Sequence, residues 1–141
     1  MCIRDRFDSD RFYQACVIPY RSSDDGIEFC LITSKKNGKW SLPKGTIRSE
    51  ETVSETIARQ AHKEAGVRGE LIEDPVGTYS YHKWETILEV VVLMMNVNEC
   101  SEEWPDADAR KRRWVTSEEA LSLLSKDDLK KLLRKAVERL N

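Results

Sequence analysis

Residues 45–67 read GTIRSEETVSETIARQAHKEAGV, and this stretch decides the fold. It opens on a glycine loop and continues into a helix whose two ends are both marked. Thr52 with Glu55 three residues later fits a capping box, and Gly66 stands where a left-handed C-terminal cap is expected. Apolar residues recur every four positions between these signals. We therefore predict a helix over residues 53–65 with an apolar stripe along one side.

Another face of the same helix carries its chemistry. Gln60, Lys63 and Glu64 are related by i, i+3 and i+4, so they share a face. Carboxylates at this spacing, presented after a glycine loop, let several oxygens converge on a hard cation. Glu64 is the one carboxylate of the three, because Gln60 is neutral and Lys63 is positively charged.

The segment before the glycine loop is rich in β-forming residues. Residues 13–20 and 27–34 flank the turn-forming cluster RSSDDG, which predicts a pair of strands. A turn at Asn37-Gly38 then leads into a short strand over residues 40–42. We expect Pro43-Lys44-Gly45 to end that strand and to open the loop.

The segment after the helix alternates strands and helices. Residues 67–72 and 78–82 are predicted as strands around an Asp74-Pro75 turn, and the continuously apolar run 87–97 as the central strand. A strand at 111–115, a helix from the Thr116 cap through Leu124 and a helix at about 126–140 follow. The predicted fold class is therefore α/β, an α/β/α sandwich with helices on both sides of a mixed central sheet.

Bulk properties limit the function. A chain of 141 residues is one domain, and 23 Lys and Arg against 25 Asp and Glu give no footprint for a nucleic acid polymer. Every apolar run is far shorter than the roughly 20 residues that span a membrane. Four cysteines without a Cys-x-x-Cys pair predict reduced thiols in a cytoplasmic protein. The sequence gives no indication of an oligomeric state.

The first six residues, MCIRDR, match what one reading frame of a common sequencing-library adapter encodes. We expect residues 1–6 to be a non-native start and the single domain to occupy residues 7–141.

The opening stretch resembles the Nudix box, whose pattern is Gly-x5-Glu-x7-Arg-Glu-aliphatic-x-Glu-Glu-x-Gly-aliphatic. Seven of its nine fixed positions match, namely Gly45, Glu51, Arg59, Ala61, Glu64, Gly66 and Val67, and Gln60 and Lys63 depart. The segments QACVIPYR, LITSKKNGKWSLPKG, VGTYSYHK and EEWPDADARKRRWVTSEEAL are similar to the diphosphoinositol polyphosphate and dinucleoside polyphosphate phosphohydrolase branch of that family.

The resemblance implies a phosphohydrolase that uses Mg²⁺ or Mn²⁺ to cleave a phosphoanhydride in a small anionic phosphorylated substrate. It implies metal ligation by Glu64, Gln60 and the carbonyl of Gly45, and a pairing of Glu51 with Arg59 that fixes the loop against the helix. Inositol-specific members carry further basic residues before the first strand, where this chain has residues 11–14, RFYQ. This favours a nucleoside diphosphate linked to another moiety, such as a dinucleoside polyphosphate.

The two departures leave two alternatives open. Three glutamates would carry a charge of −3, whereas Gln60 (0), Lys63 (+1) and Glu64 (−1) sum to zero. In one alternative Lys63 acts as a tethered cation in the place of the metal, and the chain is a catalytically impaired module that binds a phosphorylated ligand. In the other, Glu64, Gln60 and Gly45 still hold one ion and slow hydrolysis survives. Candidate replacement carboxylates are Glu50, Glu55 and Glu85.

Other residues are candidates for contact with the substrate. Arg21 and Arg110 match positions that resemble phosphate contacts in this branch, and a guanidinium binds phosphate oxygens in a bidentate way. Lys44 directly precedes the motif glycine. Tyr79, Tyr81, His82 and Trp84 are candidates for stacking on a nucleobase, although alternating aromatic residues on a strand more often serve packing.

Overall fold

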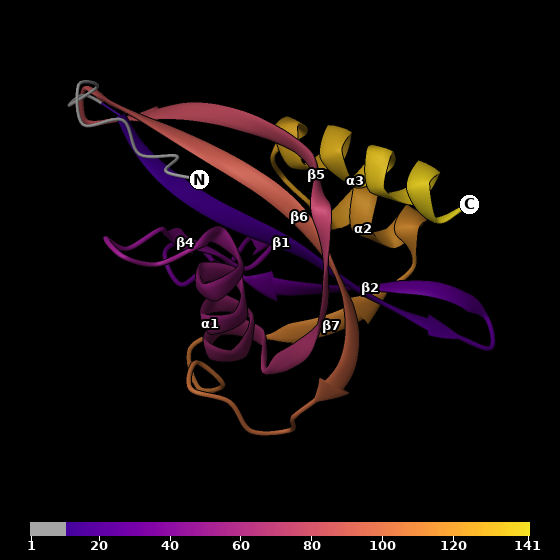
Figure 1. The fold of residues 1–141 in the computed structure, drawn as a ribbon. Helices are drawn as coiled ribbons and strands as arrows, with labels where there is room; N and C mark the ends of the chain where they lie inside the picture. Colours follow the sequence, from indigo (N-terminus) through magenta and orange to yellow (C-terminus); the bar gives the residue numbers. More distant parts are fainter. Residues whose placement is uncertain (1–10) are drawn as a thin grey trace.

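The computed structural model describes residues 11–141 and shows a mixed β-sheet with helices on both faces (Figure 1). The strands are β1 (Arg11–Ser23), β2 (Gly26–Thr33), β3 (Trp40–Ser41), β4 (Lys44–Thr46), β5 (Val67–Lys83), β6 (Thr86–Cys100) and β7 (Arg112–Val115). The helices are α1 (Val53–Ala65), α2 (Ser117–Leu123) and α3 (Asp127–Leu140). The predicted α/β/α sandwich is confirmed, and the expected non-native start lies outside the described residues.

Strands β1 and β2 each pair with three other strands of the sheet. The strands follow the order β3-β2-β1-β6-β5, with β4 paired to β1 and β7 paired to β2. The β1–β6 pair is parallel and the other pairs are antiparallel. The apolar run 87–97 lies inside β6, which is an interior strand between β1 and β5, whereas the middle of this order, expected for residues 87–97, is taken by β1.

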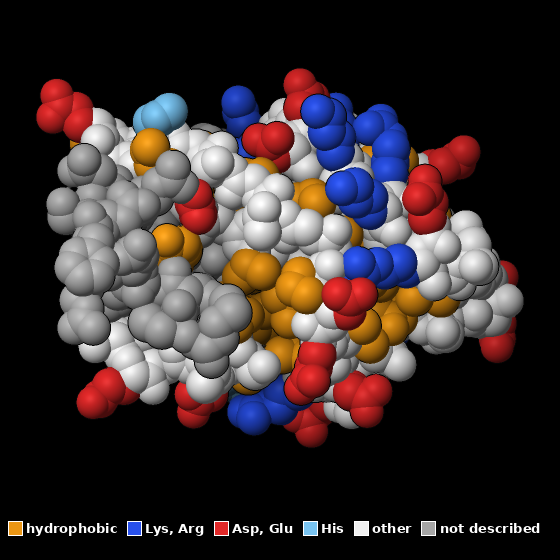
Figure 2. Space-filling view, turned by 45° about the horizontal axis from the view of Figure 1, so that its top comes forward, with side chains coloured by type: hydrophobic (Ala, Val, Ile, Leu, Met, Phe, Trp, Pro, Cys, Tyr) orange, Lys and Arg blue, Asp and Glu red, His pale blue; other side chains and the backbone are white. Residues whose placement is uncertain are grey.

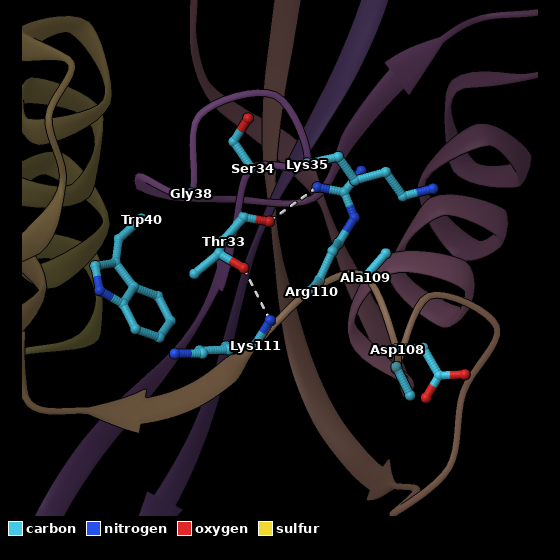
Figure 3. Close-up of a pocket in the computed structure, with 10 residues that line it drawn as sticks. Thr33, Ser34, Lys35, Gly38, Trp40, Asp108, Ala109, Arg110 and Lys111 are labelled. Atoms are coloured by element: carbon cyan, nitrogen blue, oxygen red, sulfur yellow. Dashed lines mark hydrogen bonds between the residues drawn. The ribbon is translucent and has the colours of Figure 1, made fainter.

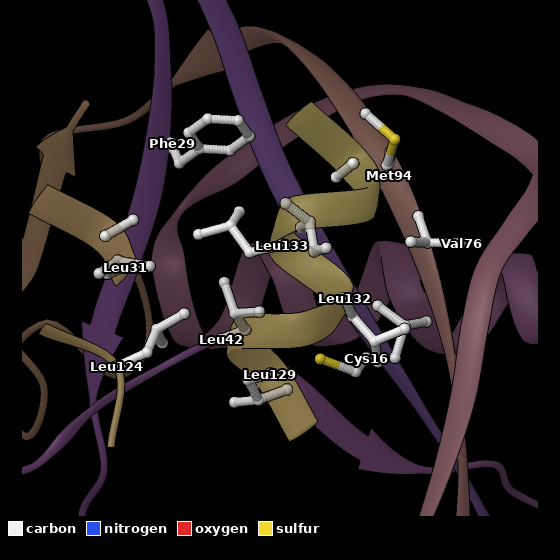
Figure 4. Packing of buried hydrophobic residues seen from close by; sticks show 14 of the residues in the cluster. Cys16, Phe29, Leu31, Leu42, Val76, Met94, Leu124, Leu129, Leu132 and Leu133 are labelled. Atoms are coloured by element: carbon white, nitrogen blue, oxygen red, sulfur yellow. The ribbon is translucent and has the colours of Figure 1, made fainter. Parts of the chain in front are cut away.

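The sheet separates two apolar clusters because successive side chains of a strand point to opposite faces. On β1, Ala15 and Val17 pack toward α1, whereas Cys16 and Ile18 pack toward α2 and α3. Figure 4 shows Leu129, Leu132 and Leu133 of α3 against the sheet, next to Phe29 and Met94. Helix α1 therefore covers one face of the sheet, and α2 and α3 cover the other.

Helix α1 has the predicted boundaries and caps. Thr52 and Glu55 form both hydrogen bonds of a capping box, and Gly66 adopts a left-handed conformation with φ 67°. Helix α2 begins in the same way, with a capping box between Thr116 and Glu119. These ends were predictable because capping depends on residues that are close in sequence.

The expected turn at Asp74-Pro75 is wrong. Strand β5 continues through this point with a register shift between Ile72 and Gly77 against β6. Proline has no N–H to donate to the ladder, so the strand bulges here. Arg139 of α3 donates to the carbonyls of Asp74 and Pro75, both at 2.7 Å, and so satisfies backbone groups that the bulge leaves unpaired.

The expectation that Pro43-Lys44-Gly45 opens a loop is also wrong. Lys44 and Gly45 belong to β4, which pairs with β1 in antiparallel register, Cys16 opposite Lys44 and Ala15 opposite Gly45. This pairing holds the segment before α1 firmly against the sheet.

The surface is mixed in charge. On the face in Figure 2, a group of Lys and Arg side chains lies beside scattered acidic ones, in keeping with the net charge of −2. Among the described helices, none is both long and apolar enough to cross a membrane.

Candidate functional site

Gln60 and Glu64 lie on the buried side of α1, against β4. The exposed fraction of Gln60 is 7% and that of Glu64 is 5%. The amide nitrogen of Gln60 donates to Oε2 of Glu64 at 2.6 Å and to the backbone carbonyl of Lys44 at 2.9 Å. Its amide oxygen accepts from Nη1 of Arg59 at 2.8 Å. These partners fix the orientation of the amide, because the first two only accept and the guanidinium only donates.

Glu64 is surrounded by donors. Its Oε1 accepts from the backbone N–H of Lys44 at 3.3 Å and lies 3.7 Å from Nη2 of Arg110. Burial raises the pKa of Glu64 above its usual value, and the positive charge of Arg110 opposes that rise. The negative charge of Glu64 is therefore partly compensated by two groups of the protein, the N–H of Lys44 and the guanidinium of Arg110.

Lys63 does not share this environment. Its side chain is exposed, and its backbone carbonyl accepts from the N–H of Asp106 at 3.0 Å. Gln60 and Arg110, rather than Lys63, take part of the space beside Glu64 that a cation would otherwise share. The candidate replacement carboxylates are also elsewhere: Glu50 and Glu85 are exposed, and Glu55 forms the capping box.

Glu51 and Arg59 are paired as the resemblance implies. Arg59 donates from Nε to Oε2 and from Nη2 to Oε1 of Glu51, both at 2.9 Å, and from Nη2 to the carbonyl of Thr46 at 3.2 Å. The hydrogen bonds from Arg59 lower the pKa of Glu51 to about 2. Arg59 also donates to the amide oxygen of Gln60. The Glu51–Arg59 pair therefore connects the loop before α1 to the buried residues Gln60 and Glu64.

The two motif glycines allow close approach of neighbouring groups. A Cβ on Gly45 would collide with the side chain of Gln60, so only glycine lets that amide reach the Lys44 carbonyl. The carbonyl that meets Gln60 belongs to Lys44, one residue before the position that the resemblance implies. A Cβ on Gly66 would press against Trp104 and Arg112, in addition to the strain of its positive φ.

Asp106 is a site residue that the sequence did not point to. It is 6% exposed and binds Nε of Arg110 at 2.9 Å and Nζ of Lys35 at 3.2 Å. Burial disfavours its charge, but the hydrogen bonds from Arg110 and Lys35 outweigh burial and lower its pKa. Arg110 also donates to the carbonyl of Thr33 at 3.0 Å, so its guanidinium is held from three sides near Glu64.

A cavity of about 550 Å³ opens in front of Glu64. Glu64 is its one carboxylate, and Tyr81, His82 and Trp40 contribute rings to its wall. Its basic lining residues are Lys35, Lys36, Lys39, Lys44, Lys83, Arg110 and Lys126. Lys44 extends across it and donates from Nζ to the hydroxyl of Tyr81 at 3.1 Å, which donates in turn to Gln14 at 2.8 Å. Burial lowers the pKa of Lys44.

A second depression of about 410 Å³ shares Ser34, Lys35, Trp40 and Arg110 with this cavity. Figure 3 shows two hydrogen bonds in the lining of this depression: the guanidinium of Arg110 donates to the carbonyl of Thr33, and the backbone N–H of Lys111 donates to the Thr33 hydroxyl. The cavity and the depression thus meet at Arg110.

Only some of the residues predicted to contact the substrate line the cavity. Lys44, Arg110, Tyr81 and His82 line the cavity, whereas Tyr79 is buried in the core. Trp84 is 83% exposed in the β5–β6 turn. Arg21 does not line the cavity: it binds Glu28 at 2.9 Å and lies over the ring of Trp114 at 3.9 Å.

Mg²⁺ is commonly held by one or two carboxylates together with substrate phosphates. Within residues 11–141, no group of three or more His, Cys, Asp or Glu side chains is arranged to hold a metal. The Gln60 amide fills the space between the Lys44 carbonyl and Oε2 of Glu64. Each carboxylate oxygen of Glu64 retains a further lone pair. The residues therefore fit one ion that Glu64 shares with a ligand's phosphates, and they do not fit a cluster of ions.

The basic cavity with one buried carboxylate, on an α/β/α domain, is the candidate site for a small anionic ligand. Comparison with known proteins identifies the group. The family model of the NUDIX domain matches residues 11–140, and the chain belongs to this family.

Individual relatives agree with this assignment. Nudix hydrolase 12, mitochondrial, of Arabidopsis thaliana is 33% identical over 142 residues, which cover 85% of this chain and 70% of that protein. Diphosphoinositol polyphosphate phosphohydrolase 2 of Rattus norvegicus is 29% identical over 113 residues, 79% of this chain and 62% of that protein. The resemblance inferred from the sequence is confirmed.

The fold is shared with solved structures. The C. elegans Ap4A hydrolase superimposes with a TM-score of 0.76 at 23% identity, covering 92% of this chain and 98% of that one. The NUDIX domain of Shewanella oneidensis NrtR, complexed with ADP ribose, gives a TM-score of 0.73 at 18% identity, covering 93% and 89% of the two chains.

Proposed function

We propose that this chain binds the phosphoanhydride of a small phosphorylated ligand in the basic cavity and hydrolyses it with low turnover. The observation that carries the proposal is the placement of one buried carboxylate, Glu64, in a wall with seven basic residues. Excess positive charge in a cavity raises the local concentration of anions. The ligand class is a nucleoside diphosphate linked to another moiety, such as a dinucleoside polyphosphate, in keeping with the names of the relatives.

Each site residue has a role in this proposal. Lys44 binds phosphate oxygens from the cavity wall, and Arg110, whose nitrogens already face protein acceptors, keeps Glu64 in place and offsets its charge. Glu64 would hold the one ion that the donor set fits, with the motif positions Gly45 and Gln60 beside it. Mg²⁺, when bound, neutralises phosphate charge and lowers the pKa of water.

Gln60 limits the chemistry in two ways. A neutral amide cannot take a proton from water as a general base. Its N–H groups also point toward the oxygens that would otherwise be open to a cation. Arg21 has no part in the proposal because it lies outside the cavity lining.

The second candidate function is a binding or regulatory module without turnover. The filled space between the Lys44 carbonyl and Glu64 favours it, because the amide already satisfies both oxygens. The free thiols of Cys16, Cys30 and Cys100 support the cytoplasmic location that we propose for either function.

Hydrolysis and binding of diadenosine tetraphosphate, each measured on the natural protein and on Glu64→Gln, separate the two functions. A hydrolase of low turnover shows slow release that depends on Mg²⁺ and is lost in Glu64→Gln, while binding without Mg²⁺ is retained. Binding without any release supports the module. Absence of binding in both proteins overturns the proposed function.

A further inference from the structure

Helix α1 ends against the loop that connects β6 to β7, residues 101–111. The last carbonyls of a helix have no partner within the helix. In this protein the carbonyl of Lys63 accepts from the backbone N–H of Asp106 at 3.0 Å, and the carbonyl of Gly66 accepts from the N–H of Ser101 at 2.8 Å. The loop therefore holds the backbone of α1 on both sides of the buried carboxylate of the site.

Arg112, the first residue of β7, joins the same two parts through its side chain. Nη1 donates to the carbonyl of Ala65 at 2.8 Å and to the carbonyl of Ser101 at 2.6 Å. One nitrogen can satisfy both acceptors because a terminal guanidinium nitrogen carries two protons. The separation between the end of α1 and the start of the loop is therefore fixed at this one atom.

The guanidinium of Arg112 also lies against the ring of Trp104 in the loop, 4.1 Å from its centre. Nε1 of Trp104 is buried and has no hydrogen-bond partner within the described part of the chain. The ring is therefore oriented by packing and by the cation beside it, and not by a hydrogen bond. Arg112 thus contacts the loop at two points, a carbonyl and a ring.

The loop that Arg112 fixes also carries partners of Glu64. Asp106 binds Nε of Arg110 at 2.9 Å, and Nη2 of Arg110 lies 3.7 Å from Oε1 of Glu64. Oε2 of the same carboxylate accepts from the amide of Gln60 at 2.6 Å. The contacts of Glu64 therefore depend on where the end of α1 lies relative to the loop.

We propose that Arg112 is a positioning residue of the site. It lines neither the cavity nor the second depression, so it acts through α1 and not on a ligand. By holding Ala65 to the loop, it keeps the carboxylate of Glu64 in reach of Gln60 and Arg110. Its effect on hydrolysis rests on the proposed function, whereas its effect on the contact between Glu64 and Gln60 does not.

Nuclear magnetic resonance of the ligand-free protein in EDTA tests this role. The readout is the chemical shift of the Gln60 side-chain N–H₂ group, whose signals are assigned by their loss in Gln60→Glu. The variants are Arg112→Gln and the matched control Arg113→Gln, an exposed neighbour in the same strand that loses the same charge and an ion pair with Glu119. Arg112→Lys keeps the charge but not the planar contact with Trp104, and it carries the test if Arg112→Gln does not fold.

In Arg112→Gln the Gln60 signals are expected to move toward the position of a free glutamine amide by at least half of the separation. Arg112→Lys gives a smaller displacement in the same direction, and Arg113→Gln gives none. A loss of overall stability does not by itself move the chemical shifts of the folded state, so the displacement reports on the site. Unmoved signals in both Arg112 variants, or an equal displacement in Arg113→Gln, overturn the positioning role.

Hydrolysis of diadenosine tetraphosphate with Mg²⁺ tests the consequence for turnover. In Arg112→Gln we expect kcat to fall roughly tenfold, while binding of the same compound in EDTA changes less than about twofold because the cavity lining is intact. An unchanged kcat with displaced Gln60 signals overturns the link to hydrolysis. If the natural protein neither binds nor cleaves this compound, the proposed function is overturned, and displaced signals still support the positioning role.

Discussion

The side-chain nitrogen of Gln60 lies 2.6 Å from Oε2 of Glu64 and so occupies the side of that carboxylate that faces the Lys44 carbonyl. A carboxylate and a carbonyl oxygen at one point are typical ligands of a hard cation. Here an N–H₂ group meets both of them. The amide of Gln60 therefore satisfies two oxygens that a metal ion would otherwise bind.

Gly45→Ala tests how closely this amide is packed. The new Cβ collides with Gln60, so we expect a loss of about 1–3 kcal/mol in the free energy of unfolding. The same substitution in a Gln60→Ala background removes the colliding atoms and is expected to cost less than about 1 kcal/mol. Urea unfolding of the four proteins of this cycle measures the coupling. An equal cost in both backgrounds contradicts the packing described.

The pairing of Glu51 with Arg59 predicts a pH dependence. The pKa of Glu51 is lowered from 4.5 to about 2 in the folded protein. A lowered pKa means that the pair contributes stability above pH 4.5, and that this contribution is lost as the pH falls from 4.5 toward 2. In Glu51→Gln the contribution is absent, so its stability relative to the natural protein recovers in this range. Unfolding by urea at several pH values shows whether the difference narrows; a constant difference argues against the pairing.

Asp106→Asn is expected to destabilise the protein by about 2 kcal/mol, because it removes the nearer of the two carboxylates that face the partly buried Arg110. Lys35 loses the same partner. The control is Asp108→Asn, an exposed position of the same loop, which is expected to change stability by less than about 0.5 kcal/mol. Chemical denaturation measures both, and similar values for the two variants would show that Asp106 does not anchor the loop.

The sequence predicted what depends on neighbours along the chain. The boundaries of α1, its capping box and the left-handed Gly66 follow from residues within a few positions of one another. The Asp74-Pro75 bulge was misread as a turn because the carbonyls exposed there are satisfied by Arg139, more than sixty residues later. No pattern of neighbouring residues predicts a partner so distant in the sequence.

The candidate site shows the same division. Helical spacing predicts that Gln60 and Glu64 share a face of α1, and they do. In one of the two alternatives Lys63 takes the place of the metal, but its side chain lies on the exposed side of α1. Asp106 and Lys126 were not singled out, since the loop that carries Asp106 and the start of α3 reach the site only through folding. A buried acidic residue in a polar loop gives no periodic signal.

Hydrolysis of diadenosine tetraphosphate with Mg²⁺ tests the central claim most directly when the natural protein is compared with the double variant Gln60→Glu, Lys63→Glu. The double variant changes the charge of residues 60, 63 and 64 from zero to −3 and replaces the amide at Glu64 with a ligand for the ion. We expect its initial rate to exceed that of the natural protein by at least about tenfold, or about 1.4 kcal/mol of barrier. A natural protein that is already as fast as the double variant would contradict the claim that Gln60 limits turnover.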